Sequence, residues 1–248
     1  MKPKNAITLL ASCLALAGVT SNTQAQIKMH GAAALCAALQ PHQAQIEAKS
    51  GQKMALVSKN AGLGLQDLLG GQADLAMVTA SIKGAAAGIK ADAASLANLQ
   101  SATITADPIV FVVNPANPVD SLTLEQAKGV ITGQITNWKD VGGKDAPIKV
   151  FGLANVNGPR IALNEQLLGD AELAKSAVIR NTPKDISPIV GQVAEGIGFL
   201  GKSNLGTGVK VLKTDKPLEM AMMIVSKGAP TAEQKALIEA CQQALGKN

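Results

Sequence analysis

The stretch from Asp107 to Val141 limits what this 248-residue chain can fold into more than any other part of the sequence. It opens with the unbroken apolar run Ile109–Val113, which is bounded by Pro108 and by two Asn-Pro pairs that begin at positions 114 and 117. An apolar run that does not alternate with polar residues predicts a strand buried on both faces, and Asn-Pro pairs predict turns. We therefore expect a central strand, of the kind found in parallel sheets, that ends in a turn.

A capped helix is expected directly after this turn. Ser121 or Thr123 can act as its N-cap, with Glu125 in the first turn. Positions 124, 127, 128 and 131 then fall at helical spacing before Gly133 stops the helix, and the single tryptophan, Trp138, follows. Strand, Asn-Pro turn, capped helix, glycine and tryptophan in this order form an uncommon pattern.

This pattern resembles the phosphate-type solute-binding proteins of ABC transporters, in which a strand is followed by NP-x-NP, L-T-x-x-Q, G-x-I-x-x-W and a Gly-Gly pair. The matching residues are Asn114, Pro115, Asn117, Pro118, Leu122, Thr123, Gln126, Gly133, Ile135, Trp138, Gly142 and Gly143. A second stretch, Gly196–Gly201, resembles the G-A-I-G-Y sequence of the same family. The resemblance implies the two-lobed α/β fold of type II periplasmic binding proteins. In that fold each lobe is a mixed sheet flanked by helices, crossover strands join the lobes, and the ligand lies in the cleft between them.

The first 25 residues have the pattern of a secretory signal peptide. Two lysines precede the apolar segment Ala6–Val19, and small residues lead to a cleavage position after Ala25. The alternative is a lipoprotein, because Leu10-Ala-Ser-Cys13 resembles a lipoprotein cleavage box and would leave Cys13 lipidated. The apolar run continues past Cys13, which favours cleavage after Ala25. We expect an exported, periplasmic protein.

The resemblance also predicts the division into lobes. Residues 26–108 with 207–248 would form lobe 1, and residues 109–206 would form lobe 2, with the first crossover around Thr105–Ile109.

Removal of the leader takes away two of the 23 basic residues and none of the 18 acidic ones, so the net charge falls from +5 to +3. A mild positive charge is compatible with a small anionic ligand and equally with an ordinary mixed surface.

Several function classes find little support in the composition. Nucleic-acid binding needs basic clusters and aromatic side chains, whereas this chain has no Tyr, one Trp and three Phe. His30 and His42 do not stand at zinc-binding spacing with the cysteines, so we expect no metal and no other cofactor. Two histidines without a G-x-S-x-G sequence also give no basis for nucleophilic hydrolysis, and we do not expect an enzyme.

Two cysteines remain after the leader, Cys36 and Cys241, both in expected helices. Export permits a disulfide, and in the resembling family the first and last helices belong to the same lobe. The alternative is a pair of buried thiols that pack as small apolar side chains. Spacing alone does not decide between the two.

The resemblance places the first part of the ligand site at the start of the first helix. The family carries G-S-T-F there, and this chain has Gly31-Ala-Ala-Ala34. The hydroxyls are absent, so the expected donors are the backbone N–H groups of Ala33 and Ala34 at a helix N-terminus. His30 stands beside this position.

The second part of the expected site lies between residues 58 and 81. A strand at Lys53–Val57 is expected to lead into a Gly-rich loop, Ser58–Gly64, in which Asn60 and Gly62 could form a backbone nest for an anion. Thr79 stands where the family has an acid that accepts a hydrogen bond from a protonated oxyanion. Because a threonine hydroxyl both donates and accepts, selection of protonated phosphate over sulfate-like dianions is expected to be weaker.

The third part follows a strand at Ile148–Phe151. Asn157 is a candidate N-cap, Gly158 belongs to the turn, and a proline fits the first turn of the helix that follows. The family has R-x-D-G-S-G-T-T here, and this chain lacks the arginine and the hydroxyls. Arg160 could supply a displaced cation, or it could be a solvated helix residue.

Two functions follow from the resemblance. In the first, the protein captures a small oxyanion, with phosphate as the first candidate, and delivers it as a monomer to an ABC permease. In the second, the fold is kept and the ligand site is degenerate, which leaves an envelope module with an interaction or sensory role.

Overall fold

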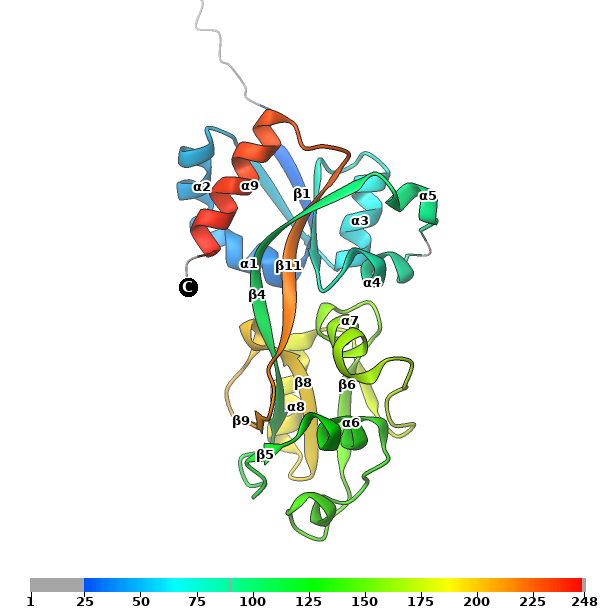
Figure 1. The fold of residues 1–248 in the computed structure, drawn as a ribbon. Coiled ribbons are helices and arrows are strands. Elements are labelled where there is room, and N and C mark those ends of the chain that lie inside the picture. Colours follow the sequence, from blue (N-terminus) through cyan, green and yellow to red (C-terminus); the bar gives the residue numbers. More distant parts are fainter. Residues whose placement is uncertain (1–24, 90, 247–248) are drawn as a thin grey trace, which may run out of the picture.

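The structure is a computed structural model that describes residues 25–89 and 91–246 (Figure 1). The expected signal peptide and the alternative lipidation at Cys13 lie outside the described residues. Within them, a nine-stranded mixed sheet runs through the whole molecule in the order β2-β1-β3-β11-β4-β8-β6-β7, with β9 paired to β4. Figure 1 shows that the elements gather into an upper and a lower lobe along this sheet, and that β4 and β11 connect them.

The upper lobe has three parallel strands, β1 (Ile27–Ala32), β2 (Met54–Lys59) and β3 (Leu75–Thr79). Its helices are α1 (Ala33–Leu39), α2 (Gln43–Ser50), α3 (Ala61–Leu69), α4 (Ile82–Ala87), α5 (Ala93–Leu96) and α9 (Ala232–Leu245), and a 3-10 turn, η1 (Gln40–His42), joins α1 to α2. Helices α2 and α9 lie on one side of these strands and α3 on the other (Figure 1). Because β3 is buried at every position, this sheet is covered on both faces.

The lower lobe has the parallel strands β6 (Lys149–Leu153), β7 (Val178–Arg180) and β8 (Gly196–Gly201). Its helices are α6 (Leu124–Thr132), α7 (Gly158–Leu163), which continues into a turn of π-helix, η3 (Asn164–Leu168), and α8 (Ile186–Gln192). The remaining short elements are β5 (Ser121–Leu122), η2 (Trp138–Val141), η4 (Pro183–Asp185), η5 (Lys202–Asn204), β9 (Lys210–Val211) and β10 (Lys213–Thr214). Residues 170–177 form turns and irregular chain that lead into β7.

Two long antiparallel strands cross between the lobes. β4 (Leu99–Val113) pairs with β11 (Leu218–Lys227) over its first eleven residues and with β8 over its last five. The expected burial of the run Ile109–Val113 is confirmed, since only Val110 is partly exposed. The expected parallel direction is wrong, because β8, β9 and β11 are all antiparallel to β4. An unbroken apolar run reports that both faces of a strand are covered and carries no information on the direction of its neighbours.

The strand pairing after residue 206 bears on the second boundary between the lobes. β9 pairs with Val112 and Val113, and β10 pairs with β5, so residues 210–214 lie beside elements of the lower lobe. We therefore propose that the chain returns within β11, from residue 218 onward.

The residues that carried the resemblance build the lower lobe. Asn114 accepts a hydrogen bond from Ala116 N at 3.0 Å and donates one from Nδ2 to the carbonyl oxygen of Gly191 at 2.7 Å. Trp138 is buried and donates from Nε1 to the carbonyl oxygen of Glu195 at 3.0 Å. Thr123 is the N-cap of α6 in a capping box with Gln126, and Gly133 ends the helix in the left-handed region at φ 79°. These side chains fix turns and loops, which explains why a local sequence pattern can identify the fold.

The cysteines are both buried and both free thiols. Burial raises the pKa of the Cys36 thiol, and it raises the pKa of Cys241 to about 12. The structure therefore has the second of the two expected arrangements, in which the thiols pack as small apolar groups in α1 and α9.

Candidate functional site

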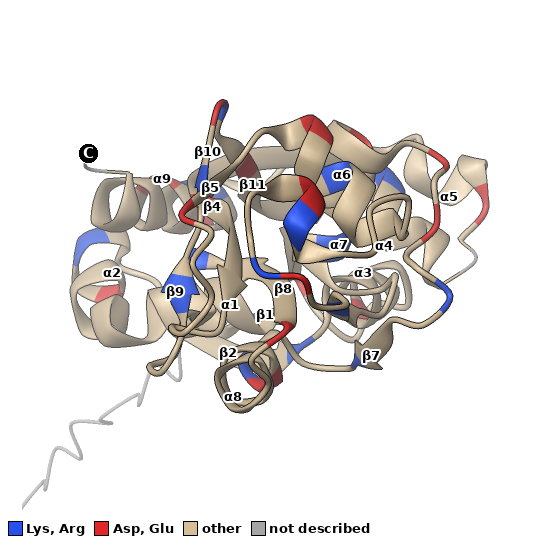
Figure 2. Cartoon of the chain, turned by 90° about the horizontal axis from the view of Figure 1, so that it is seen from below, with Lys and Arg blue, Asp and Glu red and all other residues tan. Residues whose placement is uncertain are grey.

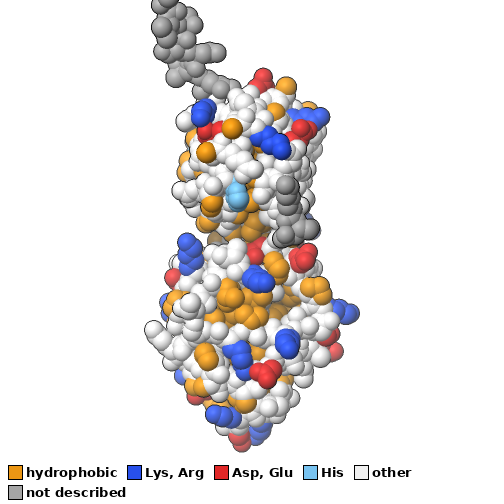
Figure 3. Space-filling model, turned by 90° about the vertical axis from the view of Figure 1, so that its left-hand side faces the viewer, with side chains coloured by type: hydrophobic (Ala, Val, Ile, Leu, Met, Phe, Trp, Pro, Cys, Tyr) orange, Lys and Arg blue, Asp and Glu red, His pale blue; other side chains and the backbone are white. Residues whose placement is uncertain are grey.

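A cavity of about 250 Å³ lies between the two lobes, at the carboxyl ends of strands from both. It is lined by residues 32–34, 59–61, 79, 156–159, 181–184, 204 and 220. Six of the eight predicted ligand residues are among them: Ala33, Ala34, Asn60, Thr79, Asn157 and Gly158. The molecule narrows between the lobes, as Figure 3 shows on one face. The carboxyl ends of strands are the usual ligand edge of an open α/β sheet, and here two such edges face each other.

The upper wall begins with helix α1. In the described part of the chain, no side chain caps the N-terminus of α1, whose N-cap residue is Ala32. The first N–H groups of a helix have no partner inside the helix, so those of Ala33 and Ala34 remain available as donors beside the cavity. Ala33 and Ala34 therefore line the cavity, and their role as anion donors stays a prediction.

Helix α3 differs from the expectation. The expected Gly-rich loop is absent, because β2 extends to Lys59 and α3 begins at Ala61. Asn60 is the N-cap, and its Oδ1 accepts a hydrogen bond from Leu63 N at 2.8 Å. A Cβ at Gly62 would meet the Ile89 side chain at 3.0 Å and Ala85 O at 3.1 Å, so Gly62 lets α3 pack closely on α4 and does not line the cavity. Its role as an anion nest is therefore wrong.

The lower wall is the start of α7. Asn157 occupies the N-cap position with extended backbone, as predicted, but its side chain donates from Nδ2 to Ala154 O at 3.3 Å instead of capping the helix. Gly158 is the first helical residue and touches the opposite lobe. A Cβ there would lie 2.1 Å from Thr79 Oγ1 and 2.8 Å from Met220 Sδ. Only glycine allows the two walls to meet at this point.

Arg160 does not reach the cavity. Its side chain is 3% exposed, and it donates from Nε to Asn164 Oδ1 at 2.8 Å and lies 3.5 Å from Glu172 Oε2. Burial lowers the pKa of Arg160, and the charge of Glu172 opposes that shift. Arg160 stands two residues after Gly158, which turns it roughly 200° around the helix axis, away from the wall that Gly158 forms. The prediction of Arg160 as a displaced ligand cation is therefore wrong.

Two lysines supply positive charge to the cavity, Lys59 from the upper lobe and Lys184 from the lower one. Neither was among the residues predicted from the sequence. Lys59 forms an ion pair with Asp67 Oδ2, and the same oxygen lies 2.7 Å from His30 Nδ1. The hydrogen bonds from Lys59 and then His30 lower the pKa of Asp67. Lys184 is exposed on η4 and has no ion-pair partner in the described part of the chain. Lys59 is the last residue of β2, and Lys184 lies four residues after the end of β7. A lysine at or just beyond the carboxyl end of a strand is the signal that could have found them.

Further polar contacts cross from one lobe to the other around the cavity. Ser81 caps α4 through a hydrogen bond from Gly84 N at 2.9 Å, and its hydroxyl donates to Glu165 Oε1 of η3. Gln166 donates to Glu219 O at 2.6 Å and accepts from Glu219 N at 3.3 Å. Within the upper lobe, between Thr79 and Ser81, Ala80 adopts φ 72° and donates from its N–H to Ala221 O at 2.8 Å. The lobes are thus held together beside the cavity by bonds that would break if they moved apart.

Comparisons with known proteins agree with this architecture. The model of the PBP superfamily domain matches residues 18–243. The phosphate-binding protein PstS of Bacillus subtilis is 29% identical over 114 residues, which cover 46% of this chain and 37% of PstS. The matched region thus spans less than half the length of that curated relative.

Two solved structures have the same fold. An ABC-type phosphate transport receptor from Vibrio cholerae is 24% identical with a TM-score of 0.69, covering 88% of this chain and 93% of the receptor. A phosphate ABC transporter substrate-binding protein from Clostridium perfringens with bound phosphate is 23% identical with a TM-score of 0.74, covering 87% of this chain and 92% of the other.

The expected fold, a type II periplasmic binding protein fold with two α/β lobes, is confirmed. Among the described residues, no helix has the length and apolar character needed to span a bilayer. The family model covers most of the sequence, and the chain therefore belongs to the PBP superfamily.

Proposed function

We propose that this protein binds a small oxyanion, with phosphate as the first candidate, in the cavity between its lobes and delivers it to an ABC permease. The observation that carries the proposal is the meeting of Ala33, Ala34, Lys59, Thr79, Gly158 and Lys184 around one small cavity. Backbone N–H groups at helix N-termini attract an anion, and one lysine from each lobe adds positive charge that attracts it further. The similarity to phosphate-binding proteins supports phosphate in particular.

Closure around the ligand is part of the proposal. A solute that contacts both Lys59 and Lys184 binds the closed form better than the open one, so it shifts the population toward the closed form. In this proposal the protein acts by binding and release, as a monomer, and performs no chemical step. The leader sequence supports export to the periplasm, where a permease would receive the solute.

Surface charge does not suggest a different ligand class. Figure 2 shows basic and acidic residues interspersed over both lobes. A mixed distribution of this kind along the described chain differs from the basic stripe expected of a nucleic-acid-binding protein. The two cavity lysines are therefore distinguished by lining the cavity and not by belonging to a basic region of the protein.

Isothermal titration calorimetry of the mature chain with phosphate, sulfate and molybdate tests the proposal. We expect saturable heat with at least phosphate, at a stoichiometry of one per chain. No heat with any of the three at millimolar ligand would contradict it.

The second candidate function is a ligand-free envelope module with an interaction or sensory role. The burial of Arg160 away from the cavity and the absence of hydroxyls at the start of α1 favour it. Permease and ATPase genes beside this one would argue against the module, whereas a neighbouring sensor or secretion gene would support it.

A further inference from the structure

The charge of the cavity lysine Lys59 is shared with a carboxylate of the protein. Its ammonium group forms an ion pair with Asp67 Oδ2, and the same oxygen lies 2.7 Å from His30 Nδ1. An ionised carboxylate can only accept hydrogen bonds, so His30 carries its hydrogen on Nδ1 in this contact. The side chains of His30 and Asp67 are 14% and 10% exposed, and charges so far removed from solvent are screened less than surface charges.

Asp67 and His30 stand behind the cavity wall and not in it. Within the described chain, Lys59 belongs to the lining and these two residues do not. Asp67 comes seven residues after Asn60, the N-cap of α3, which is about 10 Å along a helix axis. His30 comes two residues before Ala32, which is about 7 Å back along β1. The ion pair therefore draws the ammonium group of Lys59 toward the body of the upper lobe, away from the helix N-termini that border the cavity.

The net charge of this group depends on His30. When the imidazole is neutral, the charges of Lys59 and Asp67 cancel, and when it is protonated the group carries one positive charge. Histidine is the side chain that ordinarily changes its charge between about pH 5 and about pH 8. The hydrogen bonds from Lys59 and then His30 lower the pKa of Asp67, so this carboxylate stays ionised over the same range.

Other titratable groups do not account for such a change. The elements packed against β1 are β2, β3, α1 and α3. Their titratable side chains are Lys59, Asp67 and the thiol of Cys36, and burial raises the pKa of that thiol, which keeps it neutral. On β1 itself, Lys28 shares the face of His30 but is exposed. Among the described residues around β1, a change of charge between about pH 5 and about pH 8 is thus that of His30.

From this arrangement we infer that Asp67 competes with the anion for Lys59, and that protonation of His30 weakens this competition. The inference rests on the proposed function and names Asp67 and His30 as positioning residues that act through Lys59. An imidazolium beside Asp67 offsets the negative charge that holds the ammonium group, so Lys59 becomes available to the anion. A carboxylate that merely held Lys59 in a binding position would act in the opposite direction, because its removal would weaken binding.

Asp67→Asn tests the competition. The amide oxygen can still accept from both donors, but the negative charge is gone. In calorimetry of the mature chain at about pH 8, we expect the dissociation constant for phosphate to fall by about fivefold or more. Asp74→Asn is the matched control, since it removes a carboxylate from an exposed position of the same lobe outside the cavity lining, and it should bind phosphate as the wild type does. Unchanged or weaker binding by folded Asp67→Asn would overturn the inference.

His30→Asn tests the effect of protonation. Its amide can donate to Asp67 from near the position of Nδ1 and stays neutral at every pH. Phosphate itself gains a proton between about pH 8 and about pH 5, so the variant is compared with the wild type at each pH and this effect cancels. We expect the two dissociation constants to agree within about twofold at about pH 8, and the variant to bind more weakly by about fivefold or more at about pH 5. His42→Asn, in η1 outside the lining, should follow the wild type at both.

The outcomes separate this inference from the proposed function. Phosphate binding by the wild type with the same ratio of His30→Asn to wild type at both pH values would overturn the inference and leave the proposed function intact. No phosphate binding by the wild type at either pH would remove both. If Asp67→Asn does not fold, the ratio for His30→Asn decides alone.

Discussion

Gly158 and Thr79 lie in direct contact across the two lobes, with room for no more than a hydrogen on the glycine. A Cβ at Gly158 would lie 2.1 Å from Thr79 Oγ1, a distance that real side chains do not adopt. Thr79 ends β3 in the upper lobe, and Gly158 begins α7 in the lower one. The closed arrangement of the cavity therefore depends on the absence of a side chain at one position.

Gly158→Ala is expected to weaken the closed form specifically. Overpacking costs about 1–3 kcal/mol, and if only the closed form bears that cost, anion affinity falls by about 5- to 150-fold. The melting temperature without ligand should change little, because the lobes can separate slightly. Calorimetry and thermal unfolding together check this. Gly70→Ala is the control, since Gly70 has φ −80° at the end of α3, outside the cavity lining. An unchanged affinity in Gly158→Ala would mean that the anion does not bind the closed form.

Glu165→Ala tests the hydrogen bond that Ser81 donates across the lobes. Glu165 is exposed, so the bond is worth no more than about 0.5–1 kcal/mol, and we expect affinity to fall by about two- to fivefold with no change in stability. Ser81→Ala is the matched variant. Because Ser81 also caps α4, it should lower both the affinity and, by about 1 kcal/mol, the free energy of unfolding. Equal behaviour of the two variants in both measurements would argue against a separate role for the interlobe bond.

Ala80→Gly should stabilise the protein. Ala80 has φ 72°, a left-handed conformation that costs an L-residue with a Cβ about 1–2 kcal/mol. The gain is reduced by the larger entropy of glycine in the unfolded chain, so we expect the free energy of unfolding to rise by about 0.5 kcal/mol. Ala48→Gly, at an exposed position inside α2, should lower it by about 1 kcal/mol. Chemical denaturation measures both, and a loss of stability in Ala80→Gly would show that its backbone is not strained.

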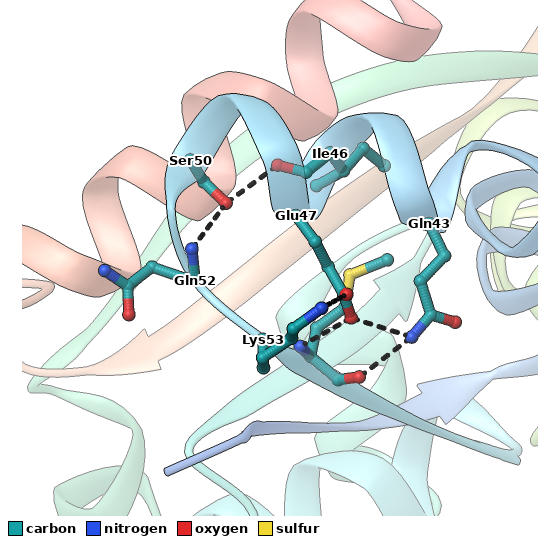
Figure 4. Close-up of polar contacts among 7 residues, drawn as sticks. Gln43, Ile46, Glu47, Ser50, Gln52 and Lys53 are labelled. Carbon is teal, nitrogen blue, oxygen red and sulfur yellow. Dashed lines mark hydrogen bonds and ion pairs between the residues drawn. The ribbon is translucent and has the colours of Figure 1, made fainter. Parts of the chain in front are cut away.

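Glu47 should make stability depend on pH in a defined window. Its carboxylate accepts from Gln43 Nε2 at 2.9 Å and from Met54 N at 3.1 Å, and it lies 2.7 Å from Lys53 Nζ (Figure 4). The hydrogen bond from Gln43 and then that from Lys53 lower the pKa of Glu47 to about 2. Because the folded-state pKa is lowered, the stabilisation is present above the unfolded pKa of about 4.3 and is lost as the pH falls through about 2.

Glu47→Gln therefore should lose on the order of 2 kcal/mol of unfolding free energy at neutral pH, and its difference from the wild type should shrink between about pH 4 and about pH 2. Denaturation at several pH values measures this difference. Glu239→Gln, on α9, controls for the loss of a charge. A difference that stays constant down to the lowest pH would show that the carboxylate is not selectively stabilised in the folded protein.

Much of the fold could be predicted because its local signals are physical constraints. Thr123 caps α6 through a capping box, and Gly133 takes a positive φ that other residues avoid. Asn157 takes the N-cap backbone conformation that its residue type favours. Each of these depends on a few neighbouring residues, so the sequence alone reveals it.

The remaining features depend on contacts between distant segments. Gly62 and Gly64 suggested a loop, but they lie inside α3 because glycine is also used where two elements approach closely. A Cβ at Gly64 would meet His30 O at 2.4 Å. The orientation of Arg160 is set by Asn164 and Glu172. Lys59 and Lys184 line the same cavity only because the two lobes face each other. No local sequence pattern can reveal such an arrangement.

The central claim is that an anion lies between the two lysines, and the phosphate affinity of Lys184→Gln tests it most directly. A hydrogen bond between charged groups contributes about 1.5–3 kcal/mol, so we expect the dissociation constant measured by calorimetry to rise by about 10-fold to 150-fold. Lys49→Gln removes the same charge from an exposed position on α2 outside the cavity lining and should bind as the wild type does. Equal affinities of Lys184→Gln, Lys49→Gln and the wild type would contradict the account.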